Sequence, residues 1–387
     1  MKLKSLILGG VTALLGTVSG FAQNVEINFT GSTAFRSAAH ATILDVLGGQ
    51  GTAEYCYDGS TYGGSSHAVI RGQFNGKTYV VRTSWSGSTA GIASVVDQTT
   101  VNVIDETINV PTTAGAMIAS PTFKAEVAQF SFSDVGVALS SRPTATLGGG
   151  PVGVVPFIFA ASPTSASATA LDNMTDQLFQ ALFSTGQLPL SMWTNNAADN
   201  PVTNPGTGRY VLPFGRDSGS GTRATTLAET QYGPFTSVQQ YGLDPVITGG
   251  AGAGNPVTGL GTLGNEGQSS GSTLRNILSS DFSNVGGENY IAIGYIGAAD
   301  GQTVINAGGK ALKYNGVDFS IDNVKNGSYT FWGYQQLFSH PTIDADQQAF
   351  DSALRAAIPN NLGSNFVSLT DMNVTRNGGD GGPISPN

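Results

Sequence analysis

Hydrophobic residues recur along this chain in two periods, and the two kinds of segment alternate. Short alternating or continuous apolar runs predict strands at residues 25–29, 77–83, 127–138, 152–161, 210–214 and 290–296. Apolar positions at helical spacing predict helices at residues 36–47, 90–96, 168–185, 222–229 and 344–358. The run from Val152 to Ala161 is almost continuously apolar, which is typical of a buried strand in a parallel sheet. Strands that alternate with helices predict an α/β fold.

Polar stretches separate these elements. Residues 48–82 are rich in Gly, Ser and Tyr and are interpreted as a hairpin insertion. Residues 195–208 and 246–273 are interpreted as loops, because Asn, Pro and Gly dominate them. The sequence has no internal repeat, and its length is sufficient for two domains.

The first residues indicate export. Lys2 and Lys4 precede an apolar stretch over residues 6–21, and the small residue Ala22 ends a cleavage site. A membrane anchor is the weaker interpretation, because the stretch contains glycines and lacks a basic flank. We therefore expect residues 1–22 to be a signal peptide and the mature protein to be soluble and periplasmic or secreted.

Charge and composition exclude several partners. The chain has a formal net charge of −9, and loss of the two lysines of the signal peptide makes it −11. So acidic a surface disfavours nucleic acid and anionic lipid. Charged residues make up only 11% of the chain and 53 residues are glycine, as in many exported proteins. Cys56 is the single cysteine, so no intramolecular disulfide forms and stability must come from the core.

Three junctions between a predicted strand and a predicted helix share one chemistry. Each places glycine and small hydroxyl residues just ahead of a helix, at residues 31–35, 84–92 and 216–223. A helix N-terminus has free backbone N–H groups and a partial positive charge, which favour anions. Glycine allows close approach, and Arg216 can pair with two oxygens of an oxyanion at once. Taken alone, each of these junctions is more simply explained as an ordinary N-cap or a glycine-rich loop. The three junctions together predict an anion site.

Residues 216–223, Arg-Asp-Ser-Gly-Ser-Gly-Thr-Arg, closely resemble the anion loop of the periplasmic phosphate-binding proteins of ABC transporters. Residues 30–35 are similar to the opening loop of that family, and residues 87–92 to its second loop. Residues 154–159 resemble its first hinge strand, and residues 292–296 its return strand. The order and rough spacing of these segments agree with the family.

The resemblance implies an α/β, two-lobed periplasmic-binding-protein (Venus-flytrap) fold with two hinge strands. It implies that residues 24–157 and 297–387 form lobe I and that residues 158–296 form lobe II. It implies a monomeric protein without a cofactor, which captures inorganic phosphate or a similar tetrahedral oxyanion for uptake by an ABC transporter permease. The implied ligand-binding residues are Ser32, Thr33, Ala34, Phe35, Ser88, Arg216, Ser220, Gly221 and Thr222, with Arg223 close by.

One departure from the family bears on specificity. The family has a loop of the type Asp-Phe-Gly-Ala-Ser-Asp, whose last aspartate accepts the proton of hydrogen phosphate. The similar stretch here is taken as residues 134–139, which puts Leu139 in place of that acid unless Asp134 or Asp217 reaches in. A site without an acceptor loses a reason to reject sulfate, so weak discrimination between the two anions is expected.

Other functions have less support. The chain has only three histidines, His40, His67 and His340, which are interpreted as surface or capping residues, and no metal-ligand spacing. It has no nucleophile elbow, so no enzyme is expected. The alternative is an exported structural or cell-surface protein that keeps the binding-protein fold without transport. Low charge, the glycine-rich stretches and the missing aspartate motivate that alternative.

Overall fold

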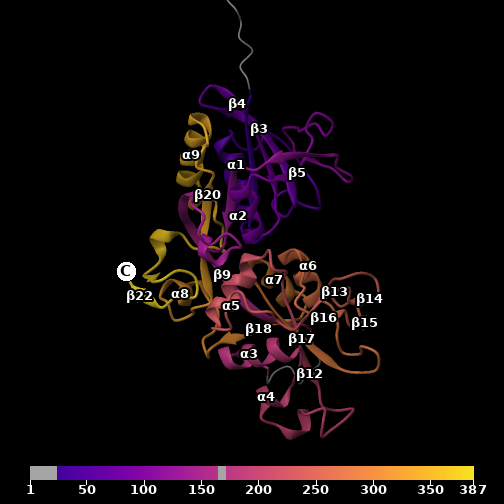
Figure 1. Ribbon diagram of the computed structural model, residues 1–387. Coiled ribbons are helices and arrows are strands. Elements are labelled where there is room, and N and C mark those ends of the chain that lie inside the picture. The colour runs from indigo at the N-terminus through magenta and orange to yellow at the C-terminus, as the bar shows by residue number, and fades with distance from the viewer. Residues whose placement is uncertain (1–23, 164–170) are drawn as a thin grey trace, which may run out of the picture.

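The computed structural model describes residues 24–163 and 171–387. The expected signal peptide, residues 1–22, lies outside the described residues. The chain forms two lobes, one above the other in Figure 1, with a sheet passing between them. The expected two-lobed, mixed α/β architecture is confirmed.

Among the described residues, one mixed sheet of twelve strands joins the two lobes. One strand, β18 (Lys310–Ala311), pairs with β9 beside the main path. From the lower lobe to the upper lobe, the others are β11 (Leu188–Pro189), β12 (Tyr210–Phe214), β17 (Tyr290–Gly297), β9 (Gly148–Ala161), β20 (Trp332–Ser339), β8 (Phe130–Ser133), β1 (Val25–Gly31), β4 (Lys77–Ser84), β3 (His67–Phe74), β2 (Glu54–Tyr57) and β6 (Ala116–Met117).

Strand β9 is where the two halves of the sheet meet. Its residues 148–156 pair with β20, and its residues 157–161 pair with β17, both antiparallel. The expected pairing between the two predicted hinge strands is confirmed, but the expectation of a parallel sheet around β9 is wrong. The strand is apolar throughout because helices of both lobes pack against it, not because its neighbours are parallel.

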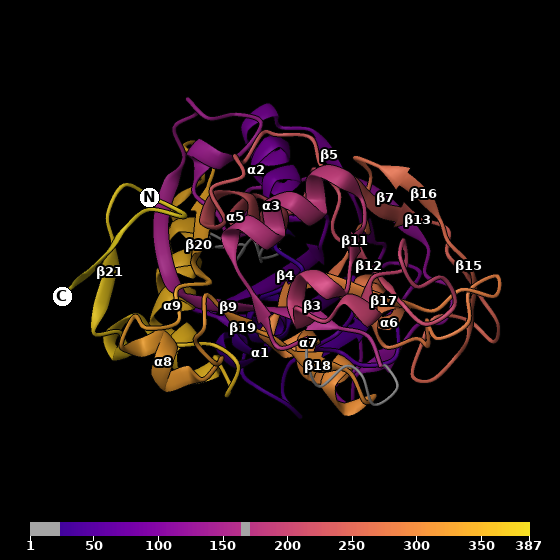
Figure 2. The same ribbon diagram turned by 90° about the horizontal axis from the view of Figure 1, so that it is seen from below.

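The helices lie around this sheet in two groups. The upper lobe in Figure 1 contains α1 (Arg36–Val46), α2 (Ser88–Asp97) and α9 (Ala345–Asn361). The lower lobe contains α3 (Asp176–Thr185), α4 (Ser191–Thr194), α5 (Gly221–Glu229), α6 (Gly271–Leu278) and α7 (Ala298–Asn306). A short helix, α8 (Ile321–Lys325), lies with the C-terminal strand β21 on the opposite side from β13, β15 and β16 (Figure 2).

Five small two-stranded sheets complete the described fold. They pair β5 (Thr100–Ile104) with β7 (Phe123–Val127), β10 (Asn173–Met174) with β19 (Lys313–Tyr314), β13 (Gln240–Leu243) with β16 (Thr262–Gly264), β14 (Val246–Ile247) with β15 (Val257–Gly259), and β21 (Val374–Arg376) with β22 (Ile384–Pro386). The segment 246–273, expected to be loops, therefore contains strands and the start of α6.

Two other sequence expectations differ from the structure. The helix expected over residues 168–185 begins only at Asp176, because Thr175 caps it by accepting a hydrogen bond from the Leu178 N–H; residues 168–170 lie outside the described residues. The strand within the expected insertion 48–82 is central rather than peripheral. As β4 it pairs in parallel with β1 and so belongs to the main sheet.

Segment 298–311 also differs from the expected division of the chain. Helix α7 packs against α6, and β18 pairs with the far end of β9. Val304 of α7 shares a buried cluster with Leu274 of α6 and Ile296 of β17. The chain therefore stays with the lower lobe after β17 instead of leaving it at residue 297.

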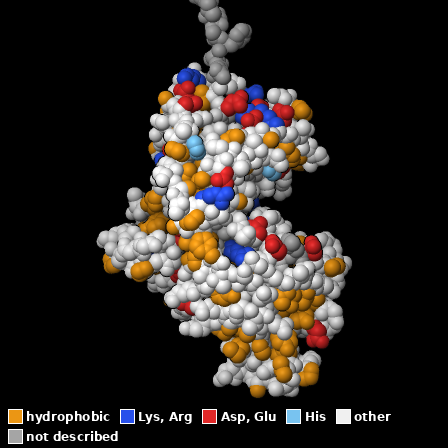
Figure 3. Space-filling model, in the orientation of Figure 1, with side chains coloured by type: hydrophobic (Ala, Val, Ile, Leu, Met, Phe, Trp, Pro, Cys, Tyr) orange, Lys and Arg blue, Asp and Glu red, His pale blue; other side chains and the backbone are white. Residues whose placement is uncertain are grey.

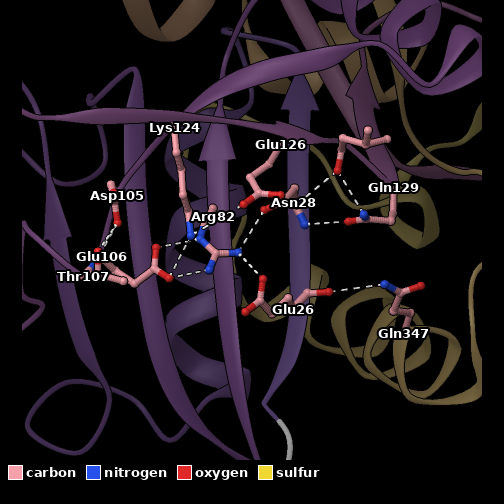
Figure 4. A network of polar contacts seen from close by, with 11 residues as sticks. Glu26, Asn28, Arg82, Asp105, Glu106, Thr107, Lys124, Glu126, Gln129 and Gln347 are labelled. Carbon is pink, nitrogen blue, oxygen red and sulfur yellow. Dashed lines mark hydrogen bonds and ion pairs between the residues drawn. The ribbon is translucent and has the colours of Figure 1, made fainter.

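A buried ion network fixes the upper lobe (Figure 4). Arg82 of β4 is fully buried and donates to Glu106 at 2.8 Å and to Glu26 at 3.1 Å, and Lys124 donates to Glu106 at 3.1 Å. Burial alone would raise the pKa of Glu106, but hydrogen bonds from the two cations lower it to about 2. The carboxylate therefore stays charged and holds β4 to the sheet formed by β5 and β7.

Candidate functional site

The first predicted loop turns sharply from β1 into α1. Gly31 has a φ of +109°, and a Cβ there would lie 2.0 Å from the carbonyl oxygen of Phe132, so only glycine fits. The Ser32 N–H donates to that same oxygen at 2.8 Å. These contacts place Ser32, Thr33, Ala34 and Phe35 beside the end of β8 and at the N-terminus of α1.

The second loop is bonded to the first loop and to the third. The Gly87 N–H donates to the Gly31 carbonyl at 2.8 Å. The backbone N–H groups of Thr89 and Ala90, at the start of α2, donate to the Gly219 carbonyl at 3.1 and 3.3 Å. The upper and lower lobes therefore contact each other directly where α2 faces the loop after β12.

The third loop leads from β12 into α5. Ser220 caps this helix, accepting a hydrogen bond from the Arg223 N–H, as an ordinary N-cap does. The next residues, Gly221 and Thr222, are buried in the first turn of α5. Ser220 keeps its own hydroxyl proton, so capping leaves it able to donate to a ligand.

Asp134, directly after β8, joins the second and third loops. The Ser88 hydroxyl donates to its Oδ1, and the Thr222 hydroxyl donates to its Oδ2 at 3.0 Å. A Cβ on Gly221 would lie 1.8 Å from Oδ1, so glycine is what allows this approach. Burial raises the pKa of Asp134, although both hydroxyls and the charge of Arg216 oppose the rise.

The position of Asp134 corrects the sequence analysis. Leu139 lies instead on a 3₁₀ turn and packs with Ile92 and Ala224 in an apolar cluster away from the carboxylate. Asp134, rather than Leu139, is therefore the carboxylate that lies between the second and third loops. Phe132-Ser133-Asp134 ends the strand as Ala-Ser-Asp ends the family loop, and this Ser-Asp pair was the signal that could have identified Asp134.

A C-terminal residue supports the loop that carries this acid. Asp380 accepts a hydrogen bond from the Gly136 N–H at 2.6 Å, two residues after Asp134. Burial raises the pKa of Asp380 to about 6. Nearby, Arg376 forms a buried ion pair with Glu229 of α5 at 2.8 Å, so the C-terminal segment contacts both lobes.

Arg216 lies after β12 and is almost fully buried. Its Nε donates to the Gln268 carbonyl at 2.8 Å, and its Nη2 donates to the Ser269 carbonyl at 2.9 Å. Burial lowers the pKa of Arg216, while Asp217 and Asp134 oppose the decrease. The two carbonyls hold the guanidinium in place on one side and leave Nη1 as its remaining donor group.

Arg223 has a different role from Arg216. Its guanidinium donates to the backbone carbonyl of Arg216 at 3.2 Å and to that of Asn265 at 2.7 Å. It also donates to the Asn265 side chain. These bonds occupy the guanidinium, so Arg223 fixes the backbone of the third loop rather than presenting a free cation.

Sequence analysis missed a second buried arginine. Arg36, the first residue of α1, is only 5% exposed, and its Nη1 has no hydrogen-bond partner within the described residues. The fully buried Ser32 hydroxyl, four residues earlier, also lacks a partner there. Burial lowers the pKa of Arg36, and the charges of Asp300, Arg275 and Arg216 also act on it. In the sequence, an arginine at a helix start gives no sign of burial.

The surroundings of the second loop also correct an expectation. His40 is not a surface residue but is fully buried, and its Nδ1 bonds the Tyr62 carbonyl at 2.9 Å. Its Nε2 accepts a hydrogen bond from the indole of Trp85 at 3.0 Å, just before the loop. Because an indole nitrogen only donates, the proton of this neutral imidazole lies on Nδ1. Burial lowers the pKa of His40 to about 3.

A groove of about 350 Å³ opens beside the contact between the lobes. It is lined by Thr89 of α2, by Ser218 and Ser220 of the third loop, and by Leu139 and Phe235. Figure 3 shows the surface hollowed between the lobes. The groove lies on the outer side of the third loop, whereas Asp134 and Arg216 lie buried behind it.

Residues 24–163 and 171–387 contain no group of three His, Cys, Asp or Glu placed to hold a metal ion. The same residues contain no helix long and apolar enough to cross a membrane.

Solved structures resemble this arrangement. A protein of Clostridium perfringens, assigned as a phosphate ABC transporter substrate-binding protein and crystallised with bound phosphate, matches with a TM-score of 0.52 at 13% identity, over 89% of this chain and 99% of that chain. This chain has the periplasmic-binding-protein fold. PstS of Borrelia burgdorferi matches with a TM-score of 0.39, and an ABC-type phosphate transport receptor of Vibrio cholerae with 0.41. Both are 13% identical to this chain. The match to the Borrelia protein covers 89% of this chain and the match to the Vibrio protein covers 88%, and each covers 99% of the solved chain. No family model and no curated protein sequence matches.

Proposed function

We propose that this protein binds inorganic phosphate between its two lobes and delivers it for uptake by an ABC transporter permease. The observation that carries the proposal is the buried carboxylate of Asp134, held by hydroxyls at two helix N-termini close to the charge of Arg216. Hydrogen phosphate is both an anion and a proton donor, so it needs cationic donors and one acceptor at the same place.

The hydroxyls of Ser88 and Thr222 donate their protons to Asp134 and so position that acid. The residues of the proposed site come from all three loops. They are the N-terminus of α1 with Ser32, Thr33, Ala34 and Phe35, the N-terminus of α2 with Ser88, and the third loop with Arg216, Ser220, Gly221 and Thr222. The N-termini of α1 and α5 favour negative charge without giving the acidic protein a basic surface, whereas the Thr89 and Ala90 N–H groups of α2 already donate to the Gly219 carbonyl. The proposed role is binding rather than catalysis.

Asp134 makes phosphate the preferred oxyanion. Its two oxygens accept hydrogen bonds from Ser88 and Thr222, so it is built as an acceptor. Hydrogen phosphate can donate its proton to such a carboxylate, whereas sulfate has no proton at neutral pH and meets a buried negative charge. The weak discrimination against sulfate expected from Leu139 is therefore replaced by a proposal of strong discrimination.

In the proposed binding protein the two lobes meet at β9, where the chain first passes from the upper lobe to the lower lobe near residue 157. The return crossing is proposed between β19 and β20, since α7 and β18 stay with the lower lobe. The proposal includes export by the segment 1–22 and action as a monomer outside the cytoplasm. Closure of the lobes around the ion would then present a single surface to the permease.

Isothermal titration calorimetry of the mature chain tests the proposed function. Phosphate, arsenate, sulfate and molybdate are each titrated near pH 8. We expect phosphate and arsenate to bind alike, because both keep a proton, and sulfate to bind at least a hundredfold more weakly. A wild-type protein that binds none of the four anions would exclude the proposal.

A further inference from the structure

We propose that Arg36 is a second arginine of the phosphate site, so that the anion is held between one guanidinium from each lobe. This inference rests on the proposed function. Arg36 begins α1 in the upper lobe, and Arg216 follows β12 in the lower lobe. Arg36 follows Ser32, Thr33, Ala34 and Phe35 directly, but sequence analysis assigned it only to a helix.

One nitrogen of the Arg36 guanidinium is buried without a hydrogen-bond partner in the part of the chain that the structure describes. Arg36 is 5% exposed, and its Nη1 has no hydrogen-bond partner within the described residues. Arg82, which is also buried, is bound instead by Glu26 and Glu106. A guanidinium nitrogen that is buried without a hydrogen-bond partner is costly unless a ligand completes it.

A hydroxyl just before the same helix is also buried without a partner in the described chain. The Ser32 Oγ is fully buried and also lacks a partner within the described residues. Ser32 and Arg36 lie on either side of the first turn into α1, whose N-terminal N–H groups favour an anion. Two unpartnered donors at one helix N-terminus indicate a shared acceptor that is not part of the chain.

Charged groups of the other lobe act on Arg36. The charges that act on it are those of Asp300 on α7, Arg275 on α6 and Arg216, together with Asp58 of its own lobe. Asp300 is already bound by Arg275 at 2.8 Å and so does not neutralise Arg36 fully. Arg36 and Arg216 therefore repel each other across the cleft, and a bound dianion converts that repulsion into attraction to both lobes.

The test compares Arg36→Met and Arg36→Lys with the control Arg71→Met, which removes a partly exposed arginine of β3. Phosphate affinity is measured by calorimetry and the melting temperature by scanning without phosphate. We expect Arg36→Met to weaken binding about 30-fold or more, Arg36→Lys to restore part of it, and Arg71→Met to bind like wild type. The melting temperature of Arg36→Met should not fall, because the substitution removes a buried unpaired charge.

Two outcomes would overturn the inference. Binding by Arg36→Met within threefold of wild type would show that Arg36 does not contact the anion, while the proposed phosphate function stands. A large fall in melting temperature of both Arg36 variants would assign Arg36 a structural role instead. Failure of wild type itself to bind phosphate would remove the proposed function and the inference together, a result distinct from both.

Discussion

The hydroxyl of Ser88, at the N-terminus of α2, donates its proton to Oδ1 of Asp134, at the end of β8. Thr222 of α5 donates to the other oxygen of the same carboxylate at 3.0 Å. Ser88 and Asp134 belong to the upper lobe and Thr222 to the lower lobe, so one buried acid bridges the two. This acid couples two properties, the closed contact of the lobes and the acceptance of a ligand proton.

The first prediction concerns the selectivity that this acid provides. Asp134→Asn replaces a charged acceptor by an amide, so phosphate should bind more weakly and sulfate more tightly. We expect the ratio of the two affinities to fall at least 30-fold, which is about 2 kcal/mol. Competition titrations of both anions near pH 8 measure the ratio.

The matched control is Leu139→Asp, five residues further along. Leu139 packs with Ile92 and Ala224 and lines the outer groove, so an added carboxylate there should leave the selectivity unchanged. A selective loss of sulfate binding in Leu139→Asp, with no effect of Asp134→Asn, would return the acceptor role to the position first inferred from sequence.

The second prediction separates the two arginines of the third loop. Arg216→Ala should weaken phosphate binding by about 2–3 kcal/mol, because a charged hydrogen-bonding group is lost from a buried site. Arg223→Ala should mainly lower the melting temperature, since its guanidinium bonds the carbonyls of Arg216 and Asn265. Calorimetry of both variants measures phosphate affinity, and thermal scanning measures their melting temperatures. Wild-type affinity in Arg216→Ala would show that Arg216 is not the arginine that binds the anion.

The third prediction uses a glycine at the contact between the lobes. In Gly221→Ala the new Cβ would lie 1.8 Å from Oδ1 of Asp134 and 2.6 Å from the Cβ of Ser88. Both neighbours belong to the other lobe, so the lobes should be forced apart without unfolding. We expect a larger radius of gyration in small-angle scattering with phosphate present, and a loss of affinity of at least tenfold.

Gly264→Ala provides the control for that experiment. Gly264 ends β16, has nothing within 4 Å of the position of an added Cβ, and has an ordinary φ. Its variant should scatter and bind like wild type. If Gly221→Ala does the same, the lobes do not close on the arrangement described for Asp134 and Ser88.

The fourth prediction concerns stability in acid. His40 has a pKa of about 3 in the folded protein, lowered by burial, against about 6.5 for an exposed histidine. Between these values the unfolded chain binds a proton that the folded chain does not, so stability is complete above pH 6.5 and falls as the pH decreases. Lowering the pH from 6.5 to 4.5 should cost about 2 kcal/mol through this residue.

Denaturant titrations over that pH range check the effect of His40. His40→Gln should be less stable at pH 7, because the bond from Trp85 is disturbed, but its stability should depend less on pH. His340→Gln changes a partly exposed histidine that bonds Thr342 and should keep the wild-type slope. Equal slopes in all three proteins would contradict a buried neutral imidazole at position 40.

The anion loops could be predicted from the sequence because their chemistry is local. Strand pairing and the burial of side chains could not be predicted in this way. Ser88 and Ser220 were identified because glycine and hydroxyl residues ahead of a helix form a local pattern. Asp134 was named only as an alternative to Leu139, because the alignment placed it at the start of the family loop and not at its end. Its role depends on contacts with Ser88 and Thr222, which are distant in the sequence.

Burial explains the other differences. Arg36 has the sequence position of a solvent-facing residue at a helix start, but in the folded chain it is buried. The same holds for His40, which an otherwise unremarkable helical pattern placed at the surface. The antiparallel pairing of β9 was hidden because a strand buried on both faces is apolar whatever the direction of its neighbours.

The position of β20 in the sheet determines the order in which the protein can fold. This strand lies between β8 and β9, yet it follows every other strand of the main sheet along the chain. A chain emerging from the ribosome therefore has a gap in its upper lobe until residues 332–339 have been made. The sheet of the upper lobe can therefore be completed only after nearly the whole chain is available, and the long loop that this closure requires makes it a slow step.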